Sequence, residues 1–326
     1  MTFEDINQIS VIGAGTMGHG IAQCFAMAGY PVVLYDVGDE VLATAQTRIE
    51  ASLELFRDAG LIEPNDIASA LERISTTTSL ADATQGSDFI VEAAPEDLAL
   101  KQSLFRDIES SARADAILAS NTSSLTMADM GTQVAREDRL VITHWFNPPQ
   151  IVPVVEVVKG PETTDETVDV SIALLNKARK TPIRIEQELP GLIVNRVQKA
   201  IIREVFDLVE QGVAGVEEID RAIQGSIGFR LASIGPLRTC DMGGLDIWLR
   251  VYNNLIPHIQ NSTDPPAVLE DLVAQGHLGA KSGKGFYDYT ADLASGELDE
   301  VVRKRDREFL ARLKSLYWDQ TQVKKA

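Results

Sequence analysis

Short apolar segments alternate with stretches of helical periodicity over the first part of the chain. A buried strand reads as a run of roughly four to eight apolar residues, whereas an amphipathic helix has apolar residues three or four positions apart. Strands are predicted at residues 8–12, 30–36, 89–94, 116–120, 141–144 and 152–158. Helices are predicted at residues 17–28, 98–112 and 38–73, the last with a break near residues 60–64. This alternation predicts an α/β fold built on a doubly wound sheet.

The pattern changes after about residue 188. Pro190-Gly191 interrupts the chain, and from Leu192 onward the periodicity is helical almost throughout. The 326 residues are enough for two domains. We therefore predict an α/β domain at residues 1–188, with a helical insertion at about 38–73, followed by an all-α domain at residues 189–326.

The predicted all-α domain has more apolar helix surface than a small domain needs to cover its own core. The helices expected at residues 197–209 and 247–259 are the clearest cases. A large apolar face without a partner in its own domain is typical of an interface with another chain. We therefore expect a homodimer that forms through this domain.

A glycine-rich loop follows the first predicted strand directly. Its sequence, Gly13-Ala14-Gly15-Thr16-Met17-Gly18, matches the G-x-G-x-x-G pattern of dinucleotide-binding loops. The first glycine allows a tight turn, the second lets a pyrophosphate approach the backbone, and the third lets the helix pack against the sheet. The N-terminus of that helix offers N–H donors to the phosphates. We predict a Rossmann-type nucleotide-binding domain, with a structural turn as the alternative.

The second predicted strand ends on a carboxylate, Asp36. A carboxylate at this place hydrogen-bonds a ribose 2′-hydroxyl and repels a 2′-phosphate. The next residues, Val37-Gly38-Asp39-Glu40, include no arginine that would hold a phosphate. NAD is therefore predicted as the cofactor rather than NADP. A strand-end or helix-capping role is the alternative for Asp36.

Two later strands carry polar residues among apolar ones. His144 ends the strand at residues 141–144, and Glu156 interrupts the apolar run at residues 152–158. A carboxylate inside so apolar a strand is costly to bury unless it is paired. A nearby imidazole is a suitable partner, and an imidazole held by a carboxylate is a proton-transfer device. With a dinucleotide site upstream, the pair predicts hydride transfer coupled to proton transfer; a satisfied buried histidine is the alternative.

The charge balance and the cysteine content narrow the class of protein. The net charge of −18 argues against nucleic acid as a partner, because its phosphates would be repelled. Two cysteines make no disulfide framework, and no apolar run approaches the roughly 18 residues that indicate a membrane span. The acidic start of the chain, residues 1–5, does not fit a signal peptide. We expect a cytoplasmic protein that acts on a small molecule, without a metal site.

Several motifs together resemble the L-3-hydroxyacyl-CoA dehydrogenase family. The resemblance runs from about residue 8 to residue 290, and its motifs stand in the family's order. They are the glycine loop and the segments at 91–96 (VEAAPE), 120–125 (SNTSSL), 144–148 (HWFNP), 190–196 (PGLIVNR) and 281–287 (KSGKGFY). The family implies a Rossmann-type domain that binds NAD, and a helical domain through which two subunits associate.

The resemblance also implies roles for single residues. His144 matches the catalytic histidine and Glu156 its carboxylate partner, at the family's spacing. Ser123 and Asn195 match residues that hold the substrate oxygen and the neighbouring carbonyl, and Asn147 matches an asparagine beside the histidine. The positions that line the NAD site correspond to Gly13, Gly15, Thr16, Met17, Gly18, Asp36, Glu96, Lys101, Asn121 and Lys281. Turn, capping or flexible surface roles are the alternatives for Ser123, Asn147, Asn195 and Lys281.

The motifs point to two different substrates. In members that use CoA thioesters, the helical region after the second strand often carries lysines, whereas here residues 52–58 hold several acids and few cations. The segment Gly228–Pro236 is more similar to the branch that oxidises free hydroxy acids, which includes L-gulonate 3-dehydrogenase (related to lambda-crystallin) and carnitine dehydrogenase. In that branch Arg230 would clamp a free carboxylate; a surface salt bridge is the alternative. The segments at 121–124 and 144–147 are closer to the acyl-CoA enzymes.

We therefore predict an NAD-dependent enzyme that interconverts a 3-hydroxyacyl-CoA and a 3-ketoacyl-CoA, in fatty acid metabolism. The alternative is a dehydrogenase of a free hydroxy acid of the gulonate, carnitine or 3-hydroxybutyrate type. A structural homologue that binds NAD without chemistry is a third reading. The presence of Ser123, His144, Glu156 and Asn195 together argues against it.

Overall fold

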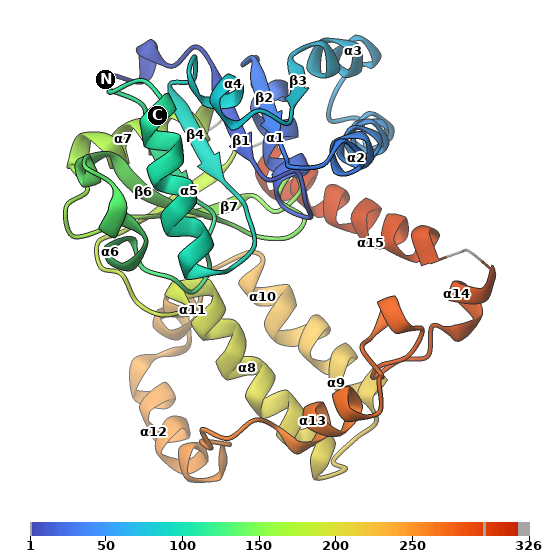
Figure 1. The fold of residues 1–326 in the computed structure, drawn as a ribbon. Coiled ribbons are helices and arrows are strands. Elements are labelled where there is room, and N and C mark those ends of the chain that lie inside the picture. Colours follow the sequence, from blue (N-terminus) through green and yellow to red (C-terminus); the bar gives the residue numbers. More distant parts are fainter. Residues whose placement is uncertain (1, 296–297, 319–326) are drawn as a thin grey trace. The chain divides into compact units, whose positions relative to one another are not determined.

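The computed structural model describes residues 2–295 and 298–318 of the chain (Figure 1). The chain forms two compact units, of which the first comprises Met1–Leu192 and Asp306–Ala326 and the second Ile193–Arg305. The first unit is an α/β structure and the second is helical. The described residues from Asp306 onward group with the first unit, whereas the sequence analysis assigns residues 189–326 to the helical domain.

An eight-stranded sheet forms the centre of the first unit. Its strand order is β3-β2-β1-β4-β5-β6-β7-β8, and all neighbours run parallel except β6 and β7, which are antiparallel. The strands are β1 (Ile9–Ile12), β2 (Val32–Tyr35), β3 (Ile74–Thr77), β4 (Phe89–Glu92), β5 (Ile117–Ser120), β6 (Leu140–Trp145), β7 (Val154–Val158) and β8 (Thr181–Ile185). The predicted doubly wound sheet is confirmed.

Helices cover both faces of this sheet because alternate side chains of each strand point to opposite faces. Val11 joins the apolar cluster formed with α1, α2 and α7, whereas Ile12 joins the cluster formed with α4, α5 and α6. The helices of the first unit before its last segment are α1 (Gly18–Met27), α2 (Asp39–Asp58), α3 (Pro64–Glu72), α4 (Leu80–Thr84), α5 (Leu98–Ser111), α6 (Met127–Met130) and α7 (Asp165–Lys177). The expected helical insertion is α2 and α3, which are separated near the predicted break.

The two edge strands, β3 and β8, are absent from the sequence-based prediction. β3 has the sequence Ile-Ser-Thr-Thr and is only partly buried. β8 contains Pro182 and Arg184, and it too is largely half-exposed. An edge strand needs no continuous apolar run, and it tolerates proline because one side of its backbone is unpaired. The criterion of a short apolar segment therefore fails at both edges of the sheet.

The last described helix, α15 (Leu298–Leu313), brings the chain back to the first unit. Leu310 and Leu313 are buried in a cluster with Phe56 and Leu61, and Trp318 packs against the same cluster. A π-helical turn, Lys314–Trp318, follows α15. Burial of these side chains is the physical reason why this segment groups with the α/β unit.

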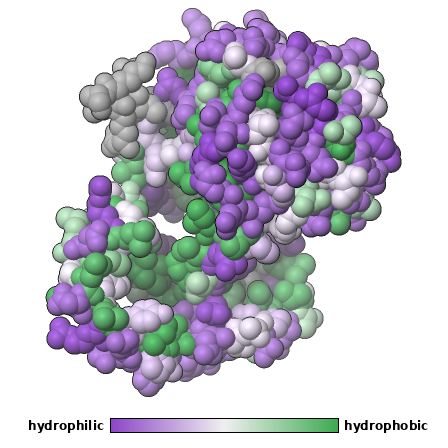
Figure 2. Space-filling model, turned by 90° about the vertical axis from the view of Figure 1, so that its left-hand side faces the viewer, coloured by the Kyte–Doolittle hydropathy of each residue, from purple (hydrophilic) through white to green (hydrophobic). Residues whose placement is uncertain are grey.

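The second unit is built from short amphipathic helices around α8. Its helices are α8 (Leu192–Glu210), α9 (Val216–Ile223), α10 (Phe229–Leu231), α11 (Pro236–Gly243), α12 (Leu245–Leu255), α13 (Ala267–Ala274) and α14 (Thr290–Ser295). Large hydrophobic side chains are exposed on α11 and α12, among them Leu237, Met242, Leu249 and Tyr252. Figure 2 shows hydrophobic side chains gathered on the surface of this unit.

Candidate active site

The glycine loop joins β1 to α1, and its three glycines meet different steric conditions. Gly13 has a φ of 104°, and a Cβ there would lie 2.7 Å from the carbonyl oxygen of Ala93. A Cβ on Gly18 would collide with the carbonyl of Gly13. A Cβ on Gly15, by contrast, would meet nothing within 4 Å. The loop is therefore packed at its first and third glycines and open at its second.

The carboxylate of Asp36 lies beside the glycine loop. Its Oδ2 accepts a hydrogen bond of 2.8 Å from the N–H of Ala14. Within the described part of the chain, no donor engages Oδ1. One oxygen thus fixes the carboxylate to the loop, and the other is available to a ligand.

His19, in the first turn of α1, contacts this loop, and the sequence motif did not indicate it. Its Nδ1 lies 2.8 Å from the carbonyl oxygen of Gly15. Burial lowers the pKa of His19, and the carbonyl of Gly15 opposes this effect in part. A neutral ring that donates from Nδ1 holds that carbonyl toward the helix, so that the N–H groups of the loop are left for an anion. The four-residue spacing between Gly15 and His19 on α1 was the available signal.

These features fit a dinucleotide. The open backbone at Gly15 and the N-terminus of α1 suit a pyrophosphate, and the carboxylate at the end of β2 suits a ribose hydroxyl. The residues that would hold NAD here are Gly13, Gly15, Thr16, Met17, Gly18 and Asp36. The site lies at the carboxyl ends of parallel strands, which is where open α/β sheets bind their ligands.

His144 and Glu156 face each other across the pair β6–β7. They are opposite residues in the antiparallel register, so their side chains leave the same face of the sheet. His144 Nδ1 lies 2.7 Å from Glu156 Oε2. Both side chains are buried, with 4% of His144 and 0% of Glu156 exposed. The structure thus brings together the two residues that the sequence analysis paired.

The contact determines which nitrogen of His144 is available for chemistry. With Nδ1–H donating to the carboxylate, Nε2 carries the lone pair and can accept a proton. The carboxylate also stabilises the imidazolium that forms when Nε2 is protonated. Phe146, whose ring centroid lies 4.5 Å from that of His144, packs against the imidazole. The geometry is that of an oriented general base.

A second buried carboxylate, Glu92, lies at the end of β4. Its Oε1 accepts hydrogen bonds from Lys101 Nζ at 2.6 Å and from the N–H of Ala94 at 2.7 Å. Its Oε2 accepts one from Ser120 Oγ at 2.5 Å. The ammonium of Lys101 is therefore engaged beneath the loop that follows β4, and it also donates to the carbonyl of Ala94. Glu92 interrupts an apolar strand as Glu156 does, and this signal was available in the sequence.

Glu96 holds the loop after β5 in place. Its Oε1 accepts hydrogen bonds from Thr122 Oγ1 at 2.6 Å, from Ser124 Oγ at 2.8 Å and from the N–H of Ser123 at 3.1 Å. Burial alone would raise the pKa of Glu96, but the hydrogen bonds from Thr122 and Ser124 and the charge of Lys101 outweigh it and lower the pKa. The hydroxyl of Ser123 has no partner within the described residues. The backbone of Ser123 is thus fixed and its hydroxyl is available.

Asn121 and Asn147 lie in the segments that follow β5 and β6. Asn121 Oδ1 accepts a hydrogen bond of 2.9 Å from the N–H of Trp145, so this side chain joins the ends of the two strands next to His144. Asn147 is exposed and precedes Pro148 through a cis peptide bond. Both asparagines thus lie at the same edge of the sheet as His144.

Three predicted site residues belong to the second unit. Asn195 is half-buried on α8. Arg230 is exposed on α10, and its Nε lies 3.4 Å from the carbonyl oxygen of Ser226. Lys281 is exposed in a 3₁₀ turn, Ala280–Ser282.

The described residues include no group of three or more histidine, cysteine, aspartate or glutamate side chains that would hold a metal ion. Over the same ranges, no helix combines the length and the apolar character needed to cross a membrane.

Comparison with known proteins identifies the family. Residues 8–189 match the model of the 3-hydroxyacyl-CoA dehydrogenase NAD-binding domain, and residues 191–289 match that of the C-terminal domain of the same family. A 5-formyl-3-hydroxy-2-methylpyridine 4-carboxylate 5-dehydrogenase of Mesorhizobium japonicum is 32% identical over 92% of this chain and 96% of its own. A solved structure of a dehydrogenase with this activity, described as an NAD+-dependent dismutase, has a TM-score of 0.88 and 31% identity over 95% of this chain and 98% of that one.

Other relatives carry different names. A probable 3-hydroxybutyryl-CoA dehydrogenase of Bacillus subtilis is 35% identical over 87% of this chain and 98% of its own. An L-carnitine dehydrogenase of Streptomyces griseus is 33% identical over 93% of this chain and 91% of its own. The substrates in the names of these relatives differ, while the matched family model is that of an NAD-binding domain. The chain belongs to the 3-hydroxyacyl-CoA dehydrogenase family and is an NAD-dependent oxidoreductase that acts on a CH–OH group.

Proposed function

We propose that His144 is the general acid–base of this oxidoreductase and that Glu156 orients it. The observation that supports this most directly is the 2.7 Å contact between His144 Nδ1 and Glu156 Oε2, made by two buried side chains. In the oxidising direction, Nε2 accepts the proton of the substrate hydroxyl as the same carbon loses a hydride. Bound NAD supplies the acceptor for that hydride. In the reducing direction, the imidazolium returns the proton to the carbonyl oxygen, and such help is worth roughly 10²–10⁴-fold.

The remaining site residues hold the substrate and the cofactor. We assign Ser123 and Asn195 to the reacting oxygen and the neighbouring carbonyl, with Asn147 beside the histidine. The unpartnered hydroxyl of Ser123, on a backbone fixed by Glu96, supports the first assignment. For the cofactor, the family pattern supports direct contacts of Glu96, Asn121 and Lys281. For Lys101 the geometry favours an indirect role, because its ammonium is bound to Glu92.

We propose a hydroxy acid with a free carboxylate as the substrate. In α2, Arg57 is paired with Glu54 and Asp58, so residues 52–58, the part that would face the phosphates of CoA, contain no unpaired cation in the described structure. On α10, Arg230 has no acidic partner among the described residues and suits a bidentate carboxylate contact. Two of the relatives are named for a pyridine carboxylate and for L-carnitine.

A 3-hydroxyacyl-CoA is the second candidate substrate. The resemblance of the segments 121–124 and 144–147 to the acyl-CoA enzymes favours it, as does the 35% identity to the Bacillus subtilis relative. This candidate requires cations outside residues 52–58 to meet the CoA phosphates.

One comparison of rates tests the substrate. We expect kcat/KM, followed by NADH absorbance, to be higher with free 3-hydroxybutyrate, gulonate or carnitine than with 3-hydroxybutyryl-CoA. The opposite ranking would select the acyl-CoA function, and no turnover with any of them would favour an NAD-binding homologue without chemistry. Arg230→Gln should lower kcat/KM for the free acid while leaving any thioester rate unchanged.

A pair of histidine variants tests the mechanism. His144→Ala should bind NADH as the wild type does but lose nearly all turnover. His258→Ala, which changes an exposed histidine outside the proposed site, is the matched control and should retain full activity. Near-normal turnover of His144→Ala would remove this histidine from the mechanism.

We further propose that the protein is a homodimer formed through the second unit. The exposed apolar side chains of α11 and α12 support this, with Leu237 81% and Leu249 62% exposed. Sedimentation equilibrium should give the mass of two chains for the wild type and of one chain for Leu249→Arg. A monomeric wild type would contradict the proposal.

We also propose a cytoplasmic location. The two cysteines without a disulfide, Cys24 and Cys240, support it. Fractionation with a cytoplasmic marker enzyme tests it.

A further inference from the structure

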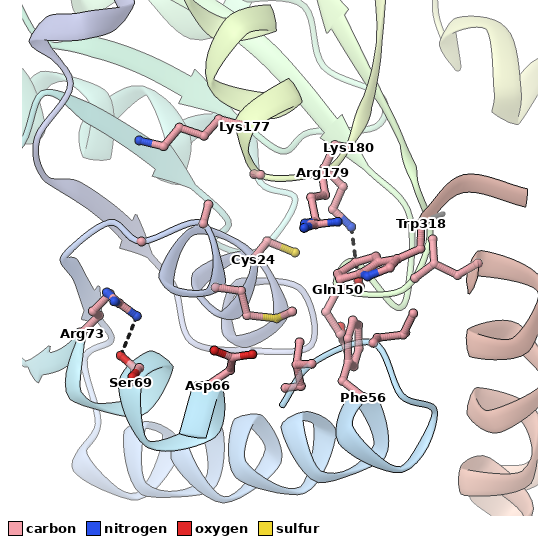
Figure 3. Close-up of a pocket in the computed structure, with 17 residues that line it drawn as sticks. Cys24, Phe56, Asp66, Ser69, Arg73, Gln150, Lys177, Arg179, Lys180 and Trp318 are labelled. Carbon is pink, nitrogen blue, oxygen red and sulfur yellow. Dashed lines mark hydrogen bonds between the residues drawn. The ribbon is translucent and has the colours of Figure 1, made fainter. Parts of the chain in front are cut away.

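The first unit contains a cavity that shares no lining residue with the candidate active site. Its volume is about 370 Å³, which is in the range of small-molecule sites. The wall is formed by the C-terminal end of α1, by α2 and α3, by residues 177–180 at the end of α7, and by the end of the described chain (Figure 3). The glycine loop lies at the other end of α1. The cavity is therefore a separate feature of the same unit.

The wall of this cavity is cationic in a chain that is strongly acidic overall. It includes Arg73, Lys177, Arg179 and Lys180 against a single acid, Asp66. The carboxylate of Asp66 accepts a hydrogen bond of 2.8 Å from the N–H of Glu63. With a net charge of −18 for the whole chain, such a local excess of cations is not a consequence of composition.

Lys180 is a buried cation without a buried counter-ion. Its Nζ donates to the carbonyl oxygens of Pro149 at 2.5 Å, Val152 at 3.0 Å and Gln150 at 3.2 Å, and no described carboxylate pairs with it. Three acceptors require three N–H donors, which favours the ammonium form. The neighbouring thiol of Cys24 does not offset the charge, since burial raises its pKa. Burial lowers the pKa of Lys180, which is the sign of an uncompensated charge that a nearby anion would stabilise.

Arg179 stands where a glycine would be easier to accommodate. Its φ is 58°, and it ends α7 with the paired hydrogen bonds of a Schellman turn, from Arg179 N to Asn176 O and from Lys180 N to Leu175 O. Its guanidinium lies 4.5 Å from the ring centroid of Trp318, and no described residue accepts a hydrogen bond from it. An unfavourable backbone conformation, together with a guanidinium that has no acceptor among the described residues, indicates a role in binding.

Apolar surface lies close to this guanidinium. Phe56 and Leu61 are buried in the wall, and the ring of Phe56 meets that of Trp318 edge to face at 6.1 Å between centroids. Figure 3 shows Arg179 and Lys180 pointing into the space above Phe56, whereas Lys177 points away from them. The ammonium of Lys177 is instead 4.0 Å from the ring centroid of Tyr30.

We propose that this cavity binds an organic carboxylate with an apolar body, apart from the oxidoreductase site. The guanidinium of Arg179 holds the carboxylate through two parallel N–H donors, and Lys180 supports it through its positive charge at longer range. Phe56, Leu61 and Trp318 cover the apolar body. The ligand is thus recognised by one charge and one hydrophobic surface, like a medium-chain fatty acid or a substituted aromatic acid.

Octanoate is the probe for a binding test on the full chain with NADH bound. The protein has 3 tryptophans, so its indole N–H signals in NMR report three places separately. Octanoate should shift the signal of Trp318 and leave that of Trp248, on α12 of the second unit, unchanged. A smaller shift of Trp145 is expected, because its ring centroid lies 5.4 Å from Lys180 Nζ. 1-Octanol should bind far more weakly. A shift of Trp248 alone, or no shift of Trp318, would overturn the proposal.

Two variants decide whether Arg179 is the anchor. Arg179→Gly removes the guanidinium and suits the local backbone, so octanoate affinity should fall about tenfold or more without a loss of thermal stability. Lys177→Gln removes a cation of the same wall that points away, and its affinity should stay close to that of the wild type. Unchanged octanoate binding by Arg179→Gly, or an equal loss in Lys177→Gln, would refute the site. Because no turnover is measured, the result is independent of the proposed mechanism.

Discussion

Replacing Glu156 by glutamine tests the energetic link between this buried carboxylate and the imidazole of His144, the proposed general acid–base. The substitution keeps the size of the side chain in a fully buried place but removes its charge. The contact that changes is the 2.7 Å hydrogen bond to His144 Nδ1. The carboxylate stabilises His144 most when the imidazole is protonated, which occurs as the substrate proton is transferred. The loss should therefore fall on kcat more than on KM.

The size of the loss follows from the strength of one charged hydrogen bond. Such a bond contributes about 1.5–3 kcal/mol, and each 1.36 kcal/mol is tenfold in rate, so Glu156→Gln should lower kcat by roughly 10–100-fold. Removal of the imidazole itself in His144→Ala should cost roughly 10²–10⁴-fold. The expected order is thus a smaller loss for the carboxylate than for the histidine.

The assay is steady-state kcat and KM, together with NADH binding and the midpoint of urea unfolding for each variant. Glu72→Gln changes an exposed glutamate at the end of α3 and is the matched control. A loss in Glu156→Gln that equals or exceeds that of His144→Ala, at unchanged stability and NADH affinity, would refute an orienting role. The carboxylate would then have a chemical role of its own.

Three other predictions concern stability and the cofactor. Lys101→Met leaves the buried Glu92 without its ion-pair partner and should lower the free energy of unfolding by about 3–5 kcal/mol in urea titrations. The double variant Lys101→Met/Glu92→Leu should recover much of this loss. Equal stability of Lys101→Met and the wild type would contradict the importance of this ion pair. Because burial lowers the pKa of His19, the unfolded chain binds a proton at this residue more readily than the folded chain does. The free energy of unfolding should therefore fall as the pH drops below about 6.5. In His19→Gln this pH dependence should be weaker, and an unchanged dependence would contradict the prediction. Asp36→Ala should weaken NAD binding about tenfold, measured by NADH fluorescence, and reduce the discrimination against NADP; unchanged selectivity would separate Asp36 from the ribose.

The central part of the sheet was predictable because its strands are buried on both faces. β1, β4, β5 and β6 are short runs with all residues buried, and such strands leave a clear apolar pattern. The edge strands β3 and β8 leave no such pattern, since they are half-exposed and accept polar residues and proline. The glycine loop was predictable for another reason, because packing at Gly13 and Gly18 excludes any side chain.

The pairing of His144 with Glu156 was predictable in identity but not in geometry. A carboxylate in an apolar strand signals that a partner exists, and the family pattern names it. That the two strands run antiparallel, with these residues directly opposite, is a property of the connection between β6 and β7. Glu92 gives the same signal, but the sequence analysis named no partner for it. Its partner, Lys101, lies on the following helix, and the family pattern assigns this lysine to the NAD site instead.

Three buried charged residues of the first unit show that a sequence pattern locates a buried charge more easily than it identifies the groups that stabilise it. Glu156 is compensated by an imidazole on the neighbouring strand, and Glu92 by an ammonium on the next helix. Lys180 is satisfied by backbone carbonyls, which carry no net charge and leave no trace in the sequence. Its positive charge therefore acts on whatever lies beside it, and what lies beside it is a cavity with an unpaired guanidinium and an aromatic wall. Of the three, Lys180 is the one that lines a cavity, so a bound anion can act as its counter-ion.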